Sequence, residues 1–432
     1  MKNSEIMQKD LKFNWHPCTQ MKDHEFLPLI PIKKAKGVYL YDFDGNKYID
    51  SISSWWVNIF GHQNKYINKA IKNQLNKLEH IIFAGFTHKG AIKLSQRLCK
   101  ITKLDKVFYA DNGSSAVEIS LKMAYHYYLN KGEKRELFFS LKNSYHGETI
   151  GALSVGDVDL YKKTYEPLLI KSIQIPVPNN QSDEEAISAL KDCEIYFEKY
   201  HNQVSSLIVE PLVQCAGEMK MYSPLFLQGL RKLCNKFDIK LILDEIATGF
   251  GRTGSMFAYF QADIKPDFLC LSKGLTGGYM PLSCVLTTNK IYQEFYCDYK
   301  KLKAFLHSHS YTANPLAISA ANAVLDIFEK KDIITKNNKK SKYIWKKIQK
   351  FKKLNNVKEI RQTGMITAIE MINYPFEKRA GLEVYKYGLK HGVLLRPLGN
   401  VIYFMPPYVI KYKEINKMIE VAYKGIQCLE DK

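Results

Sequence analysis

The stretches that decide the fold are residues 240–244, KLILD, and residues 268–273, FLCLSK. Each contains a short apolar run and ends on a polar side chain, Asp244 in the first and Lys273 in the second. Apolar strands that alternate with helices are typical of a buried, mostly parallel sheet, so the sequence predicts an α/β fold. Three earlier runs have the same character: residues 107–109, 137–139 and 207–209.

Polar residues follow each of these predicted strands. In a parallel sheet, ligands gather where the strands reach their carboxyl ends, so we expect the functional site there. Gly113 and Ser114 also stand before a helical stretch, and the N–H groups at a helix start bind phosphate well, although a plain helix cap is the alternative. The polar stretches are 110–115, 143–147, 210–211, 244–245 and 272–274.

Lys273 and Asp244 are the residues with the clearest chemistry. A lysine at a buried strand end loses its proton readily and attacks carbonyls, as Schiff-base lysines do, although most single lysines lie on the surface. A buried carboxylate one strand earlier suits the ring nitrogen of pyridoxal 5′-phosphate, although it would also suit a loop cap. Tyr145 is placed to stack on such a ring or to pack in its loop. Their joint order at strand ends predicts a pyridoxal-phosphate site.

A competing motif occurs at residues 249–254, where GFGRTG matches the dinucleotide fingerprint G-x-G-x-x-G. No clear helix start follows it, and no acidic residue ends a strand about 20 positions further on. We therefore reject a nicotinamide oxidoreductase and expect Arg252 to be a cation near the substrate or a loop anchor.

The net charge of +20 raises the alternative of a nucleic-acid binder. The lysines are spread along the chain, and the densest stretch, residues 330–353, mixes them with apolar residues as in an amphipathic helix with a solvated face. No nucleic-acid motif accompanies them. We predict no nucleic-acid partner, and salt-sensitive binding would reveal one.

The nine cysteines are scattered, odd in number and never spaced as C-x-x-C. This pattern argues against a disulfide framework and a zinc ribbon, so we expect no metal and a reducing compartment. Residues 1–14 are polar, without the apolar core of a signal peptide, and no run reaches the ~18 apolar residues of a membrane span. We expect a cytoplasmic protein without a membrane partner.

The chain is long enough for two domains. In residues 38–50 apolar and polar side chains alternate, and DGN at 44–46 is typical of a turn, so this segment is predicted to be a β-hairpin. The last quarter of the chain has the pattern of helices and short strands. The predicted parts are an N-terminal segment, 1–60, that packs with the small domain, a large cofactor-binding domain, 61–325, and a small C-terminal domain, 326–432.

Residues 243–254, LDEIATGFGRTG, followed by SKG at 272–274, resemble the signature of class III aminotransferases, and the resemblance extends over almost the whole chain. It implies the fold-type-I architecture of pyridoxal-phosphate-dependent transferases. In that architecture a large domain with a mainly parallel seven-stranded sheet accompanies a smaller α/β domain. The resemblance also implies a homodimer with active sites at the interface.

Further stretches resemble the branch of this class that converts 8-amino-7-oxononanoate to 7,8-diaminononanoate in biotin biosynthesis. Trp55 and Trp56 are similar to relatives that use S-adenosylmethionine as amino donor. Cys18 departs from them, because those relatives have a tyrosine there, and Glu148 replaces an aspartate. Residues 307–312, HSHSYT, resemble relatives that take lysine. We expect adenosylmethionine as donor, with lysine or another class III ω-aminotransferase reaction as alternatives. The stretches are 15–17, 53–56, 145–147, 396–399 and 402–408.

The resemblance also implies roles for single residues. Lys273 is the catalytic residue that holds the cofactor, Asp244 pairs with its ring nitrogen, and Tyr145 stacks on the ring. The phosphate is held by two pairs of residues, Gly113 and Ser114 of one chain and His309 and Ser310 of the partner subunit.

Substrate contacts are implied as well. Arg396 takes the carboxylate of the oxononanoate, in agreement with the bidentate pairing of arginine with carboxylates. The tryptophan pair offers an apolar wall for an aliphatic chain, and we expect one of the two to serve core packing instead. The implied substrate residues are Cys18, Trp55, Tyr145, Lys273, Ser308, Arg396 and Tyr403.

Overall fold

The computed structural model describes residues 2–27, 29–372 and 374–430, which fall into two compact units. Unit 1 comprises the chain up to residue 64 together with 339–361 and the part from 366 onward, and unit 2 comprises 65–338 and 362–365. The units thus divide after residues 64 and 338, whereas the domain boundaries predicted from the sequence follow residues 60 and 325. Helix α11 (Pro315–Lys330) falls in unit 2 because it packs against α3 (Lys65–Leu75) and α4 (Lys89–Thr102).

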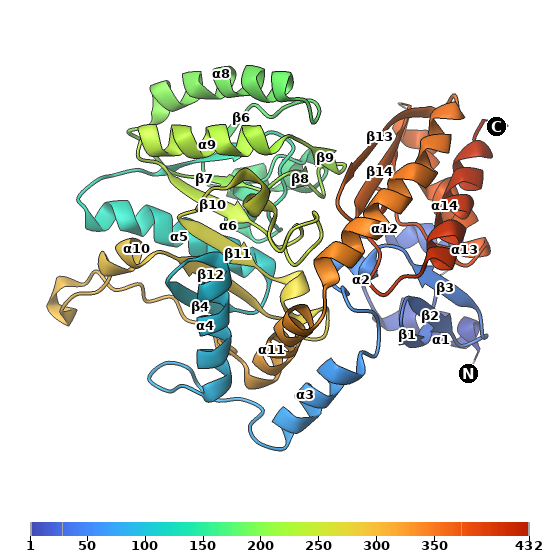
Figure 1. Cartoon of the computed structure of the whole chain (residues 1–432), viewed down its shortest axis with the longest axis horizontal. Coiled ribbons are helices and arrows are strands. Elements are labelled where there is room, and N and C mark those ends of the chain that lie inside the picture. Colours follow the sequence, from blue (N-terminus) through green and yellow to red (C-terminus); the bar gives the residue numbers. More distant parts are fainter. Residues whose placement is uncertain (1, 28, 373, 431–432) are drawn as a thin grey trace. The chain divides into compact units, whose positions relative to one another are not determined.

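A seven-stranded sheet forms the centre of unit 2, in the order β4-β12-β11-β10-β7-β5-β6 (Figure 1). Strand β12 is antiparallel to both of its neighbours, and the other neighbouring strands pair in parallel. The predicted α/β fold with a mainly parallel seven-stranded sheet is confirmed. The strands are β4 (Lys106–Ala110), β5 (Leu137–Leu141), β6 (Ser172–Ile175), β7 (Val204–Val209), β10 (Lys240–Asp244), β11 (Phe268–Leu271) and β12 (Ser283–Thr287).

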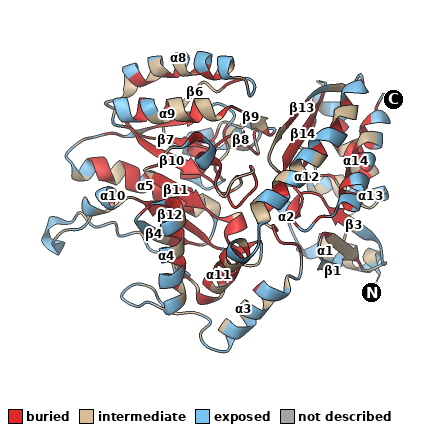
Figure 2. Cartoon of the chain, viewed as in Figure 1, coloured by how far each residue is buried: buried red, intermediate tan, exposed pale blue. Residues whose placement is uncertain are grey.

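Helices cover this sheet. Helix α5 (Gly113–Asn130) packs against β7, β10, β11, β12 and β4, while α9 (Pro224–Lys236) contacts β10 and carries α8 (Asp183–Tyr200) on its outside. The strands between them are buried, as Figure 2 shows. This burial on both faces is the reason why the strands could be predicted as continuous apolar runs. The shorter elements of unit 2 are α6 (Ile150–Ser154), α7 (Asp159–Lys162), η2 (Lys163–Leu168), β8 (Val213–Gln214), β9 (Lys220–Met221), η3 (Ala258–Ala262), η4 (Lys273–Thr276), α10 (Asn289–Gln293) and η5 (Tyr299–Lys301).

Unit 1 contains two small sheets. One has the order β1-β2-β3-β15 and the other the order β13-β14-β16. The predicted hairpin at residues 38–50 is confirmed, because β2 pairs antiparallel with β3. Strand β15 then pairs in parallel with β3, so the C-terminal part adds a strand to the N-terminal hairpin. The strands are β1 (Ile32–Lys36), β2 (Tyr39–Asp42), β3 (Lys47–Asp50), β13 (Val357–Thr363), β14 (Ile366–Met371), β15 (Val393–Leu394) and β16 (Val401–Phe404).

The lysine-rich stretch forms the predicted amphipathic helix, α12 (Ile333–Ile348), with Ile344 and Ile348 buried and Lys346 and Lys347 exposed. In the part of the chain that the structure describes, no helix has both the length and the apolar character needed to cross a membrane. The helices that lie wholly within unit 1 are α1 (Asn3–Phe13), η1 (Met21–Glu25), α2 (Ser53–Trp56), η6 (Gln349–Lys353), η7 (Phe376–Lys378), α13 (Ala380–Lys390) and α14 (Tyr412–Gln427).

Candidate active site

The loops that follow β5, β7 and β10 meet at one edge of the sheet in unit 2. The Nδ1 of His146, from the loop after β5, lies 2.8 Å from Oδ2 of Asp244 at the end of β10. The backbone N–H of Tyr145 donates to Oε1 of Glu210, which follows β7, at 2.9 Å. The structure thus joins three of the polar stretches that the sequence placed at strand ends.

Asp244 and His146 form a buried pair, with 5% and 0% of their side chains exposed. The second carboxylate oxygen of Asp244 accepts the N–H of Ile246 at 3.1 Å, so both oxygens are held. The Nε2 of His146 is buried without a hydrogen-bond partner among the described residues. His146 therefore orients Asp244. The sequence contained His146 only as part of the YHG stretch, and no role was predicted for it.

Glu210 is a buried carboxyl beside this pair. Burial raises its pKa to about 7, the His146 ring opposes this rise, and the Asp244 carboxylate adds to it. Its two oxygens accept N–H groups of Tyr145 and Cys215, the latter at 3.0 Å. With a pKa of about 7, both the neutral and the charged form of this carboxyl are populated near neutral pH. The sequence indicated Glu210 only as a polar residue after a strand.

Lys273 follows β11 and begins η4 with a left-handed φ of 32°. Burial lowers the pKa of its amine, while the Asp244, Cys215 and Glu210 side chains act in the opposite direction. A lower pKa leaves more of the amine neutral at physiological pH, and the neutral amine is the form that attacks a carbonyl. The environment of Lys273 therefore suits a nucleophile.

The start of α5 forms a cradle for an anion. Oδ1 of Asn112 accepts the N–H of Ser115 at 2.9 Å and caps the helix. Gly113 and Ser114 follow as its first two residues, and N–H groups at such positions have no acceptor within the helix. The cradle thus offers donors to a phosphate.

Gly147 closes the cradle from the loop after β5. Its φ is 124°, and a Cβ at this position would overlap the Oγ of Ser114, so only glycine fits. The same Oγ accepts the N–H of Thr149 at 3.3 Å. The anion cradle, the buried carboxylate and the lysine together fit the three recognisable parts of pyridoxal phosphate: its phosphate, its ring nitrogen and its aldehyde.

Tyr145 and the loop at 307–310 complete the predicted cofactor residues. Tyr145 is half-buried, and its hydroxyl donates to Oε1 of Glu148 at 3.0 Å. The Nε2 of His309 lies 3.2 Å from Oδ1 of Asp111 in the same chain, next to the anion cradle. Ser308 and Ser310 are exposed. The contribution of His309 and Ser310 to the partner's phosphate site stays a prediction, as does the contact of Ser308 with substrate.

Four of the predicted substrate residues, Cys18, Trp55, Arg396 and Tyr403, lie in unit 1. The guanidinium of Arg396 sits over the Trp55 ring, 4.6 Å from its centre, and 41% of Trp55 is exposed. Trp56 is buried, and its Nε1–H donates to the hydroxyl of the buried Tyr403 at 3.0 Å. The expectation that one tryptophan serves core packing is confirmed by Trp56. The structure places Tyr403 in that core as well, and its contact with substrate stays a prediction.

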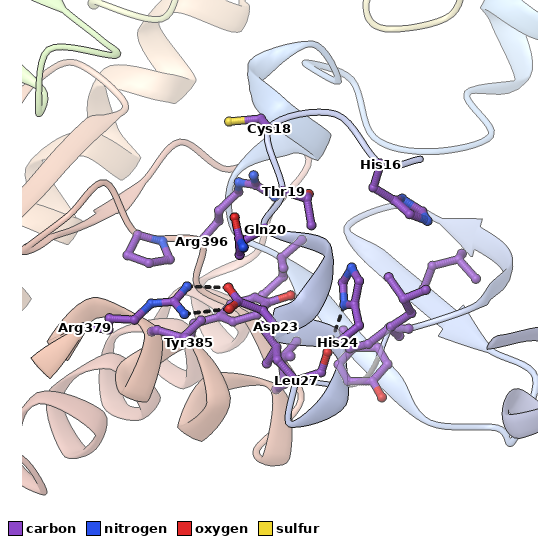
Figure 3. Close-up of a pocket in the computed structure, with 18 of the residues that line it drawn as sticks. His16, Cys18, Thr19, Gln20, Asp23, His24, Leu27, Arg379, Tyr385 and Arg396 are labelled. Atoms are coloured by element: carbon purple, nitrogen blue, oxygen red, sulfur yellow. Dashed lines mark hydrogen bonds and ion pairs between the residues drawn. The ribbon is translucent and has the colours of Figure 1, made fainter. Parts of the chain in front are cut away.

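Arg396 and Cys18 line a cavity of about 460 Å³ within unit 1 (Figure 3). One wall is polar, with Arg379 bound to Asp23 through two hydrogen bonds of 2.8 and 2.5 Å. Among the described residues of this unit, the Arg396 guanidinium has no carboxylate partner of its own. The apolar part of the lining includes Leu27, Leu29, Ile30, Leu382, Leu389 and Leu394.

Comparison with known proteins identifies the family to which the chain belongs. The family model for class-III aminotransferases matches residues 20–425, and the chain belongs to this family.

Particular relatives are similar over nearly the whole chain. The adenosylmethionine-8-amino-7-oxononanoate aminotransferase of Helicobacter pylori is 54% identical over 417 residues, which cover 95% of both proteins. The crystal structure of the aminotransferase of that name from Methanocaldococcus jannaschii matches with a TM-score of 0.94 at 40% identity, over 99% of both chains. A PLP-bound amine transaminase from an uncultivated Pseudomonas species matches with a TM-score of 0.91 at 28% identity, over 96% of this chain and 98% of its own.

Proposed function

We propose that this aminotransferase uses pyridoxal phosphate to convert 8-amino-7-oxononanoate to 7,8-diaminononanoate in biotin biosynthesis. The observation that carries the acceptor is Arg396, a guanidinium stacked on the exposed Trp55 ring and without a carboxylate partner among the described residues of its unit. Such a group binds a carboxylate in a bidentate manner, while the indole gives an aliphatic chain an apolar surface. The names of the relatives point to the same acceptor.

The residues of unit 2 would hold the cofactor. Pyridoxal phosphate, when bound, supplies an electron sink for the transfer of an amino group. The N–H groups of Gly113 and Ser114 would hold its phosphate, and Asp244 would keep a proton on its ring nitrogen. His146 orients Asp244 for this role through the bond from Nδ1. Tyr145 would pack against the ring.

Lys273 has two roles in this proposal. Its amine would bind the cofactor covalently and, when an amino substrate displaces it, would move a proton at the reacting carbon. Both roles need a neutral amine, and burial lowers the pKa of Lys273 toward that form. The carboxylate of Asp244 limits this fall, so the amine can also return a proton.

The amino donor is proposed to be S-adenosylmethionine, on the strength of the tryptophan pair, with lysine as the alternative. Mixing the purified enzyme with each donor alone and following the cofactor absorption tests this. Conversion of the cofactor to its amine form by adenosylmethionine is expected. A response to lysine and none to adenosylmethionine would contradict the donor. Subsequent failure to aminate 8-amino-7-oxononanoate would contradict the acceptor.

We also propose a cytoplasmic homodimer in which His309 and Ser310 reach the phosphate site of the partner subunit. The exposure of Ser308 and Ser310 supports this arrangement, because exposed polar residues are available to a second chain. The scattered, odd-numbered cysteines support a reducing compartment. Light scattering of the purified protein is expected to give twice the chain mass of 49.9 kDa.

A further inference from the structure

The short element α2 is a turn of left-handed helix. Its four residues have φ values of 53°, 46°, 69° and 73°, and none of them is glycine. The turn has the usual helical hydrogen bonds, from Trp56 N–H to the carbonyl of Ile52 at 2.8 Å and from Val57 N–H to that of Ser53 at 3.1 Å. L-residues avoid this conformation, and a run of them persists only where the surroundings impose it.

Asp50 imposes the turn from its N-terminal side. Its carboxylate is fully buried and accepts the N–H of Ser54 at 2.9 Å and the hydroxyl of Ser54 at 2.7 Å. The Nε2 of His62 lies 3.0 Å from Oδ2 of the same carboxylate. Asn58, four residues before His62, holds the other ring nitrogen at 2.9 Å. A single carboxylate thus ties the strained turn to His62.

The far side of the turn is anchored to the C-terminal part of unit 1. The hydroxyl of Ser53 donates to the carbonyl of Met405 at 2.7 Å, and the indole of Trp56 donates to Tyr403. With Ser53, Ser54 and Trp56 fixed, the remaining residue, Trp55, is the one that projects outward. Its ring is the surface on which the Arg396 guanidinium rests. Trp55 owes its direction to the left-handed backbone, because a right-handed turn would point it elsewhere.

We propose that Asp50, together with His62, is a positioning residue for substrate recognition. It holds the left-handed turn, the turn orients Trp55, and Trp55 supports Arg396 for the carboxylate of the acceptor. This inference rests on the proposed function for the role of Arg396. Neither Asp50 nor His62 touches the acceptor.

The test is Asp50→Asn in the holoenzyme. In this variant an amide NH2 group replaces Oδ2 of Asp50. An NH2 group donates and does not accept hydrogen bonds, so it would face the N–H of His62 with a second donor and the contact would be lost. We expect the KM for 8-amino-7-oxononanoate to rise about tenfold, while kcat stays within about threefold of the wild-type value. The reason is that the weakened contact, between Arg396 and the carboxylate of the acceptor, contributes equally to the ground state and the transition state. In an Arg396→Ala background, Asp50→Asn should raise this KM by less than about a further twofold. Both substitutions act through the same contact of Arg396 with the acceptor carboxylate, so their effects should not add.

Asp42→Asn is the matched control. Asp42 is also buried in unit 1, in the preceding strand β2, and accepts hydrogen bonds from Asn46 at 2.7 and 2.8 Å, but it does not touch the turn. It should lower stability and leave KM unchanged. If Asp50→Asn does not fold, Ser54→Ala removes a single hydrogen bond to Asp50 and should raise KM in the same direction.

Three results of the KM measurements overturn the proposal: an unchanged KM in the folded Asp50→Asn and Ser54→Ala variants, a KM rise in the Arg396→Ala background as large as in the wild type, or an equal KM rise in Asp42→Asn. The emission of Trp55, taken as the difference from Trp55→Phe, gives a readout that needs no substrate. If the wild-type enzyme does not aminate 8-amino-7-oxononanoate, the proposed function fails, and Trp55 emission then decides the positioning claim. Unchanged emission in Asp50→Asn would overturn it, and a shifted emission would support it.

Discussion

Replacement of Glu210 by glutamine should change how stability depends on pH. The Glu210 carboxyl has a pKa of about 7 in the folded chain, against an ordinary value of 4.5. That difference corresponds to about 3 kcal/mol of unfolding free energy. Because the folded pKa is the higher one, the stabilising contribution is complete below pH 4.5 and is lost as pH rises toward and through 7.

The glutamine variant has no group that titrates at this position, and it also has one hydrogen-bond acceptor fewer than the wild type. In the wild type both carboxyl oxygens accept backbone N–H groups, whereas the glutamine amide nitrogen accepts none. The lost bond costs about 1–3 kcal/mol at every pH. Glu210→Gln should therefore be less stable than wild type at pH 5, and by pH 8 this deficit should shrink by about 2–3 kcal/mol or reverse.

Urea unfolding of the cofactor-free protein at pH 5, 6, 7 and 8 measures the effect. Glu420→Gln is the control, because a hydrogen bond from Lys350 lowers the pKa of Glu420. Its contribution changes only below about pH 4.5, so that variant should run parallel to wild type between pH 5 and 8. Parallel profiles for wild type and Glu210→Gln would refute the account of Glu210.

Substitutions at three positions test the site itself. Asp244→Ala should lower kcat by roughly 100-fold or more, since the buried charge is lost, and steady-state kinetics would contradict this with a normal kcat. Gly147→Ala should weaken cofactor binding severely, because its Cβ meets Ser114, and a titration showing wild-type affinity would contradict the cradle. Arg396→Ala should raise the KM for 8-amino-7-oxononanoate by about 10- to 100-fold, with Arg396→Lys in between, and an unchanged KM would remove its carboxylate role.

Much of the large sheet could be predicted from the sequence. Strands β5, β7, β10 and β11 are apolar because the sheet is covered on both faces, and their carboxyl ends mark the site. Strand β6 was not predicted, because it lies at the edge of the sheet and is only half-buried. Its residues, SIQI, therefore form no apolar run. Strand β12 escaped because its antiparallel direction breaks the strand-helix alternation on which the prediction depended.

The site residues divide in the same way. Lys273, Asp244 and the glycine-serine turn could be found because each stands at the end of a strand or just after it. The pairing of His146 with Asp244 and the burial of Glu210 depend on contacts between loops far apart in sequence, which local patterns do not encode. The left-handed turn at 53–56 could not be predicted from the sequence either. It contains no glycine, and it is held by a hydrogen bond to Asp50, which precedes the turn.

The central claim is that Lys273 holds the cofactor, and borohydride reduction of the holoenzyme tests it most directly. Reduction should fix a phosphopyridoxyl group on the peptide that contains Lys273, as read by mass spectrometry. Lys273→Ala should carry no such group and should not turn over. A label on a different lysine, or normal transamination by Lys273→Ala, would contradict the account.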